Sequence, residues 1–188
     1  MKAPRFDPSR LDVTAFARAR GELSGTTDVA GFKRLAEALV APADGAPAPV
    51  RWLAAGHWSE RAGRPPEPRL QLSAQATVWL ECQRCLQPMA SPLDVNGRFL
   101  FVDGEAEAAR LDEESEEDVL ALPRALDLFE LLEDELILAL PIVPCHDACP
   151  QPITFSAEAG ADFVAAGGDG PGHPFAVLAG LKPGKPES

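Results

Sequence analysis

Residues 127–149, DLFELLEDELILALPIVPCHDAC, carry the strongest helix signal of the chain and lead directly into two cysteines. Asp127 is suited to cap a helix, and Glu130 follows it at the spacing of a capping box. Proline cannot continue a helix, so Pro141 and Pro144 force an extended segment ahead of the cysteines. The stretch therefore predicts a helix over 127–139, with its apolar face made of Phe129, Leu132, Leu136 and Ala139.

The preceding half of the chain has the pattern of a sheet. Residues 69–81 alternate apolar and polar side chains, as a half-buried antiparallel strand does. Residues 89–102 resume this pattern, so the two predicted strands form a hairpin with Cys82 and Cys85 at its tip. The other predicted elements are short: a helix over 11–20, a strand or turn over 22–27, a helix over 28–40, and strands over 50–61 and 119–123.

These elements predict the α+β class, with an antiparallel sheet or small open β-barrel and packed helices. Residues 103–118 hold many carboxylates and few apolar side chains, so we expect a flexible acidic loop there. Residues 1–150 are expected to form a single domain. Residues 151–188 are rich in Pro, Gly and Ala and predict a tail, in which the apolar segment 174–182 docks on the main body or on a partner.

The net charge of −12 is concentrated in one part of the sequence. Residues 1–100 carry +3, residues 101–150 carry −13 and residues 151–188 carry −2. Bulk charge therefore does not favour nucleic-acid binding, although a local basic face on the first half stays compatible with RNA. The sequence has neither an apolar run of membrane-spanning length nor a secretory signal, which predicts a cytoplasmic protein without a membrane partner.

The four cysteines are arranged as two closely spaced pairs, Cys82 with Cys85 and Cys145 with Cys149. In a reducing cytosol we expect thiols or metal ligands rather than disulfides. Two such pairs that face each other would hold one structural Zn²⁺, with His146 as a substitute ligand. Unpaired reduced thiols are an open alternative. A redox dithiol at Cys82 and Cys85 is another, but the motif lacks the helix that thioredoxin-like chemistry uses.

Motifs of common enzyme classes are absent from the sequence. It has no G-x-S-x-G, no P-loop, no H-E-x-x-H and no Gly-rich dinucleotide turn. Its histidines, His57, His146 and His173, lie in different neighbourhoods. We therefore expect a protein that is not an enzyme and takes no small-molecule substrate.

Three segments resemble the YceD family, which is described as large ribosomal RNA subunit accumulation proteins. They are ECQRCL at 81–86, LLEDELILALPIVP at 131–144 and PFAVLAGLK at 174–182. The resemblance implies a cytosolic, non-catalytic factor needed for normal levels of 23S ribosomal RNA, in processing or in large-subunit assembly. The implied partner is the 23S rRNA precursor or a basic large-subunit ribosomal protein. A cysteine-based redox or zinc-handling module is the alternative.

Matching positions nominate four residues for binding RNA or a partner: Arg84, Glu133, Asp134 and Glu135. Arg84 is suited to phosphate contact, whereas the acidic segment suits a basic protein. Pairing of Arg84 with Glu81 or with a carboxylate of the acidic loop is an equally compatible alternative.

Overall fold

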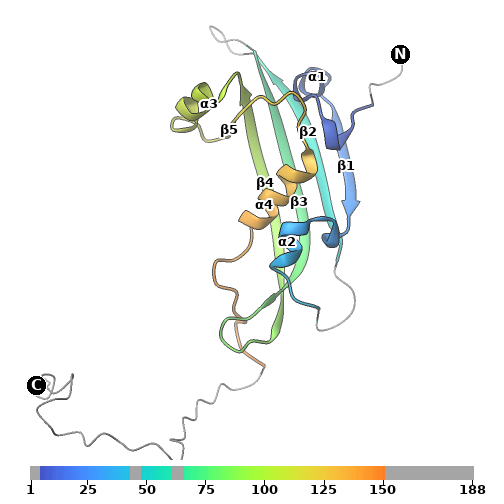
Figure 1. Cartoon of the computed structure of the whole chain (residues 1–188), viewed down its shortest axis with the longest axis vertical. Helices are drawn as coiled ribbons and strands as arrows, with labels where there is room; N and C mark the ends of the chain where they lie inside the picture. Colours follow the sequence, from blue (N-terminus) through green and yellow to red (C-terminus); the bar gives the residue numbers. More distant parts are fainter. Residues whose placement is uncertain (1–4, 43–47, 61–65, 151–188) are drawn as a thin grey trace, which may run out of the picture. The chain divides into compact units, whose positions relative to one another are not determined.

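A five-stranded sheet in the order β1-β2-β3-β4-β5 forms the centre of the computed structural model (Figure 1), which describes residues 5–42, 48–60 and 66–150. The pairings β1 with β2, β2 with β3 and β3 with β4 are antiparallel, whereas β5 runs parallel to β4. The edge strands β1 and β5 do not pair with each other, so the sheet is open and not a barrel. The strands are β1 (Glu22–Thr27), β2 (Val50–Ser59), β3 (Glu67–Glu81), β4 (Pro88–Val102) and β5 (Asp118–Ala121).

The hairpin of β3 and β4 is the longest pairing of the sheet, and each strand has 15 residues. Its register runs from the pair Arg69 and Leu100 at one end to the pair Glu81 and Pro88 at the tip. Burial alternates along β3, because successive side chains point to opposite faces of a sheet. The strands predicted over 69–81 and 89–102, and the hairpin between them, are thus confirmed.

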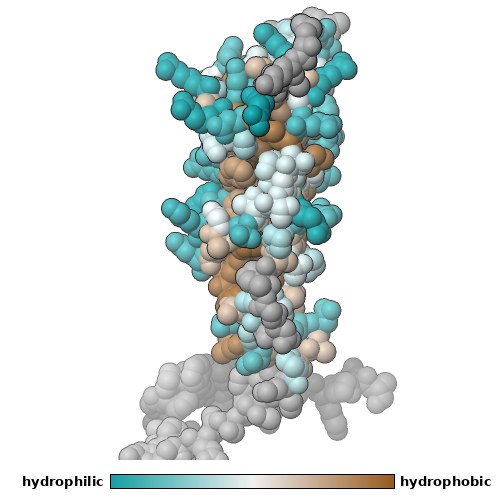
Figure 2. Space-filling view, turned by 90° about the vertical axis from the view of Figure 1, so that its right-hand side faces the viewer, coloured by the Kyte–Doolittle hydropathy of each residue, from teal (hydrophilic) through white to brown (hydrophobic). Residues whose placement is uncertain are grey.

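Three of the helices cover one face of this sheet. In Figure 1, α4 (Leu128–Leu138) and α2 (Lys33–Glu37) lie in front of the strands, and α1 (Val13–Arg18) lies near the far end of β1. Three leucines of α4, spaced one turn apart, are completely buried in the core: Leu128, Leu132 and Leu136. Figure 2 looks onto the β1 edge and shows hydrophobic residues along the length of the body between polar margins. The α+β class is confirmed.

The helix predicted over 127–139 is confirmed, and Asp127 caps it by accepting hydrogen bonds from the backbone N–H groups of Phe129 and Glu130. The helix predicted over 28–40 is wrong in extent. A short 3-10 turn, η2 (Val29–Gly31), precedes α2, and the backbone N–H of Val40 already donates to Trp79 of β3. Tertiary pairing therefore ends the helix early. A second 3-10 turn, η1 (Pro8–Arg10), precedes α1.

The acidic segment 103–118 is not a loop throughout, because residues 105–112 form helix α3 (Glu105–Asp112). Ala108 and Leu111 are buried against Leu100 and Val119. Leu100 alternates along β4 with Phe99 and Phe101 of the main core, so this contact lies on the sheet face opposite α4. The sequence did not predict this helix, because the many carboxylates around Ala108 and Leu111 are also typical of a solvated loop. The helix is also the crossover that lets β5 run parallel to β4, so the expectation of a wholly antiparallel sheet is wrong for its last strand.

The predicted tail 151–188 and its docking segment 174–182 lie outside the described residues. Within the described ranges, no helix combines the length and apolar character needed to cross a membrane.

Candidate metal centre

Cys82 and Cys85 lie in the turn that joins β3 to β4. The turn is closed by backbone hydrogen bonds from Leu86 N–H to Cys82 O (2.8 Å) and from Cys82 N–H to Gln87 O (3.0 Å). Leu86 adopts a left-handed φ of 59°, which reverses the chain within a few residues. The tight turn places both sulfurs on the same side of the hairpin tip.

The segment that follows α4 runs to this tip, as Figure 1 shows. Two hydrogen bonds with backbone N–H donors join it there. Gln83 N–H donates to Pro144 O at 2.8 Å, and His146 N–H donates to Cys82 Sγ at 3.4 Å. The sequence did not predict that Gln83 pairs with Pro144, because their contact joins a backbone N–H to a backbone carbonyl and depends on no particular side chain. These two hydrogen bonds place the segment that carries the second cysteine pair next to the turn that carries the first.

Four side chains meet at the tip: Cys82, Cys85, His146 and Cys149. One ligand atom from each lies within 4.8 Å of all the others. Cys85 Sγ is 3.4 Å from His146 Nδ1. Cys82 is buried, the other three are half-buried, and none forms a disulfide. Cys145 is not part of this group, so the cluster differs from the predicted four-cysteine set by holding His146, the predicted substitute ligand. Which of the two sets binds a metal stays a prediction.

The cluster favours one thiolate. Burial raises the pKa of Cys82, but hydrogen bonds from the backbone N–H groups of His146, Cys85 and Arg84 outweigh it and lower that pKa to about 5. Burial, followed by hydrogen bonds to Cys85 and Cys82, raises the pKa of Cys149 to about 11. The opposite pKa shifts favour the thiolate form of Cys82 over that of Cys149. Thiolates are the form in which cysteine binds metals.

Arg84 stands between the two cysteines of the turn and is exposed. Its guanidinium donates a hydrogen bond to the backbone carbonyl of His146, instead of pairing with Glu81 or with the acidic segment. This hydrogen bond is a further link between the two arms of the cluster. One arm is the hairpin turn with Cys82 and Cys85, and the other is the segment after α4 with His146 and Cys149. The remaining guanidinium N–H groups stay available to an outside ligand, so the predicted role of Arg84 in RNA contact stays a prediction.

The nominated carboxylates Glu133 and Asp134 are engaged within the protein. Glu133 accepts hydrogen bonds from the backbone N–H groups of Arg34 (2.6 Å) and Leu35 (3.2 Å), and both carboxylates form ion pairs with the Arg34 side chain. Glu135 is half-buried, and burial, followed by nearby carboxylates, raises its pKa. These contacts tie α4 to α2, which sequence spacing did not predict. The predicted partner-binding role of the three carboxylates stays a prediction.

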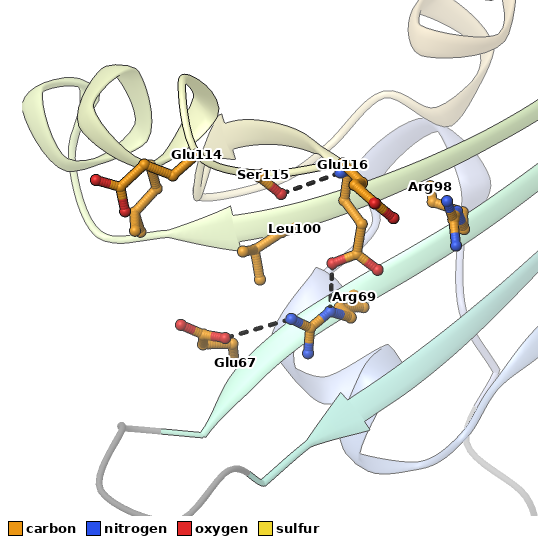
Figure 3. A pocket seen from close by; sticks show the side chains of 9 residues that line it. Glu67, Arg69, Arg98, Leu100, Glu114, Ser115 and Glu116 are labelled. Atoms are coloured by element: carbon orange, nitrogen blue, oxygen red, sulfur yellow. Dashed lines mark hydrogen bonds and ion pairs between the residues drawn. The ribbon is translucent and has the colours of Figure 1, made fainter.

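A hollow of about 520 Å³ lies at the other end of the hairpin (Figure 3). In it, Arg69 is paired with Glu117 at 2.7 Å and with Glu67 at 3.5 Å. Arg98, from the neighbouring strand, has no ion pair among the described residues. The wall contains neither histidine nor cysteine and consists of Glu67, Arg69, Arg98, Leu100, Leu111, Glu114, Ser115, Glu116 and Glu117.

Comparisons with known proteins point to one family. A family model described as "Large ribosomal RNA subunit accumulation protein YceD" matches residues 70–182. A protein of Haemophilus influenzae with the same description is 35% identical over 108 residues, which is 57% of this chain and 62% of that protein. The matched part thus spans less than two thirds of the relative's length. No solved structure matches.

Proposed function

This chain belongs to the YceD family of large ribosomal RNA subunit accumulation proteins, and we propose that it is a non-catalytic factor in ribosome biogenesis. In this proposal it supports the accumulation of 23S ribosomal RNA and assembly of the large subunit in the cytoplasm. The observation that carries the proposal is the family match over 70–182, which includes the hairpin, α4 and the metal centre.

We propose that the protein acts by binding either the 23S rRNA precursor or a basic protein of the large subunit. Arg84 supports the first mode, because an exposed guanidinium at a hairpin tip can contact phosphate. The −13 charge of residues 101–150 supports the second, because it attracts cationic partners.

The experiment is depletion of the protein in its own host, followed by complementation. Depletion is expected to lower 23S rRNA relative to 16S rRNA and to reduce large subunits in a sucrose gradient. Unchanged ratios would overturn the proposed function. Incubation of the purified protein with 23S precursor should leave the length of the RNA unchanged, whereas defined cleavage would overturn the non-catalytic role.

Arg84→Ala distinguishes the two binding modes. If the precursor is the partner, this variant should bind precursor RNA more weakly and should complement poorly. If a basic ribosomal protein is the partner, binding to that protein should weaken with added salt, and Arg84→Ala should complement normally. Arg124→Ala removes an exposed arginine outside the tip and is the matched control.

A cysteine-based redox or zinc-handling module is the second candidate function, and the cluster at the hairpin tip is the observation that favours it. This function requires the cysteines either to release the metal to another molecule or to pass electrons to one. Under that function, the double variant Cys82→Ser with Cys85→Ser would fold but fail to complement. Normal 23S rRNA levels with this variant would exclude the second candidate.

For the main proposal, the cofactor is a single structural Zn²⁺ held in the same cluster. It would stabilise the tip and take no part in a reaction. Structural sites of this kind have four protein ligands, whereas catalytic sites keep one position open.

A further inference from the structure

We infer that Cys82, Cys85, His146 and Cys149 form a closed site for one Zn²⁺ that fastens the segment after α4 to the tip of the β3–β4 hairpin. The inference deepens the cofactor proposal by naming its ligands and its mechanical role. It leaves Cys145 as a free thiol beside the site. It does not require the ribosomal function to be correct.

The spacing of the ligand atoms fits a zinc ion. Zinc lies about 2.3 Å from sulfur and about 2.0 Å from imidazole nitrogen, so tetrahedral ligands are separated by roughly 3.5 to 3.8 Å. The contact between Cys85 Sγ and His146 Nδ1 is 3.4 Å, and all four ligand atoms lie within 4.8 Å of one another. Closure therefore needs side-chain movements of about an ångström or less, and no rearrangement of the backbone.

The donor set selects the class of metal. Three sulfurs and one imidazole are ligands for zinc and other thiophilic ions, whereas Mg²⁺ and Ca²⁺ take oxygen ligands. Three thiolates around Zn²⁺ leave one negative charge in the site. Arg84 stands between Cys82 and Cys85 in the chain, and its guanidinium donates a hydrogen bond to the backbone carbonyl of His146, so a positive charge lies beside the inferred ligands. A cationic neighbour of this kind stabilises an anionic zinc centre.

The surroundings hold the ligands in place before any metal arrives. The backbone N–H of His146 points at Cys82 Sγ, and its backbone carbonyl accepts a hydrogen bond from Arg84. The hydrogen bond between Gln83 and Pro144 aligns the two arms next to the ligands. Outer contacts of this type orient metal ligands and raise metal affinity.

The segment that the ion would fasten has little else to hold it. Ile142 is 100% exposed and Val143 is 63% exposed, so the chain between α4 and the cluster gains little from hydrophobic burial. Leu86, at the hairpin tip, is also exposed. Without metal, the two arms are joined mainly by the few hydrogen bonds described above. A metal with a ligand from each arm supplies the strong link that packing does not.

The test is zinc binding by the full-length protein and two neighbouring variants. His146→Ala and Cys145→Ser change adjacent residues, but only the first removes an inferred ligand. Wild type and Cys145→Ser should each hold one equivalent of zinc with the same affinity in competition with a chromogenic chelator. His146→Ala should bind zinc more than about 100-fold more weakly, since even the loss of an outer contact costs 10- to 100-fold.

Two further readouts do not depend on affinity. The Co²⁺-substituted protein should show the absorption of a tetrahedral site with thiolate ligands. The zinc-loaded wild type should leave a single thiol reactive, and Cys145→Ser should leave none, because the other three cysteines are ligands. Hydrogen exchange at Gln83 and His146 should slow when zinc is added.

Several outcomes would overturn the inference. Loss of zinc in Cys145→Ser with retention in His146→Ala would establish the four-cysteine site instead. Four reactive thiols and no zinc, in folded protein supplied with the metal under reducing conditions, would remove the site. Zinc bound as inferred in a protein that does not affect 23S rRNA would contradict the proposed function alone. Normal 23S rRNA with a protein that never binds zinc would contradict the site alone.

Discussion

Glu133 shows how a single side chain joins two parts of the chain that lie 99 residues apart. Its carboxylate accepts from the backbone N–H groups of Arg34 and Leu35 and pairs with the Arg34 guanidinium at 3.1 Å. The Glu133 side chain is only 12% exposed. It therefore satisfies the otherwise free N–H groups at the start of α2, as a capping residue would from within the same helix.

Glu133→Gln should lower the free energy of unfolding by about 1–3 kcal/mol at pH 7, because charged hydrogen bonds at a half-buried site are replaced by weaker ones. Burial raises the pKa of Glu133, but the Leu35 and Arg34 contacts outweigh it and hold the pKa below 4.5. The stabilisation is thus present above pH 4.5 and is lost as the pH falls through the lowered pKa. Urea unfolding of wild type and Glu133→Gln at several pH values measures the difference between their free energies of unfolding.

The matched control is Glu130→Gln, an exposed position on the same helix. It should change stability by less than about 0.5 kcal/mol. The contrary result is a difference in free energy of unfolding between Glu133→Gln and wild type that stays constant down to pH 3 or grows as the pH falls. Either outcome would show that the ionised carboxylate of Glu133 does not stabilise the contact between α4 and α2.

The sequence predicts individual site residues well where the residue type is rare in the chain. It fails where the folded geometry decides which of two adjacent residues faces the site. Cysteine spacing located the candidate metal centre because the chain has only four cysteines, all of them in the two closely spaced pairs. It could not decide between Cys145 and His146, because adjacent side chains of an extended segment point in opposite directions. The partnership of Arg34 with Glu133 was equally hidden, since it arises from the packing of α2 on α4.

At the scale of elements, Gly56 sets how closely α1 approaches β2. A Cβ atom there would lie 2.8 Å from Phe16 Cδ1 and 2.9 Å from the Phe16 backbone carbonyl. Because backbone atoms cannot move aside as a flexible side chain can, Gly56→Ala should lower the free energy of unfolding by about 1–3 kcal/mol. The variant's melting temperature should fall accordingly.

Gly31→Ala is the control, because a Cβ atom fits at this glycine without a clash. Its nearest neighbour would be Thr27 Cγ2 at 3.4 Å, an ordinary contact distance. The melting temperature should change little or rise slightly, since alanine reduces the freedom of the unfolded chain. Equal losses in both variants would mean that close packing on Phe16 is not the cause.

The elements that the sequence predicted well are those with one uninterrupted period. Strand β3 alternates over its entire length, and α4 has both a cap and an apolar stripe. Helix α3 was missed because its short apolar face, Ala108 and Leu111, is surrounded by carboxylates that also suit a solvated loop. The direction of β5 depends on that helix, so the second error followed from the first.

Across the whole molecule, the sheet has two separate hydrophobic clusters on its opposite faces. The large cluster lies under α1, α2 and α4, and the small one lies under α3. Leu132→Ala, in the large cluster, should cost about 2–5 kcal/mol of global stability. Leu111→Ala, in the small cluster, should mainly release α3 and β5.

Hydrogen exchange distinguishes these two effects. In Leu111→Ala, amides of α3 and β5 should exchange faster while those of β2 and β3 keep their protection. In Leu132→Ala, protection should fall throughout the sheet. A uniform loss of protection in Leu111→Ala would show that the two clusters unfold as one unit.

The order of the inferred metal ligands along the chain has a consequence for synthesis. Cys82 and Cys85 leave the ribosome in a local hairpin that can form early, but His146 follows Cys85 by 61 residues, after α3, β5 and α4. A nascent chain interrupted before that point has only half of a site. Ion capture by all four ligands would therefore be the last event of domain assembly, and zinc retention would distinguish a finished domain from a truncated one.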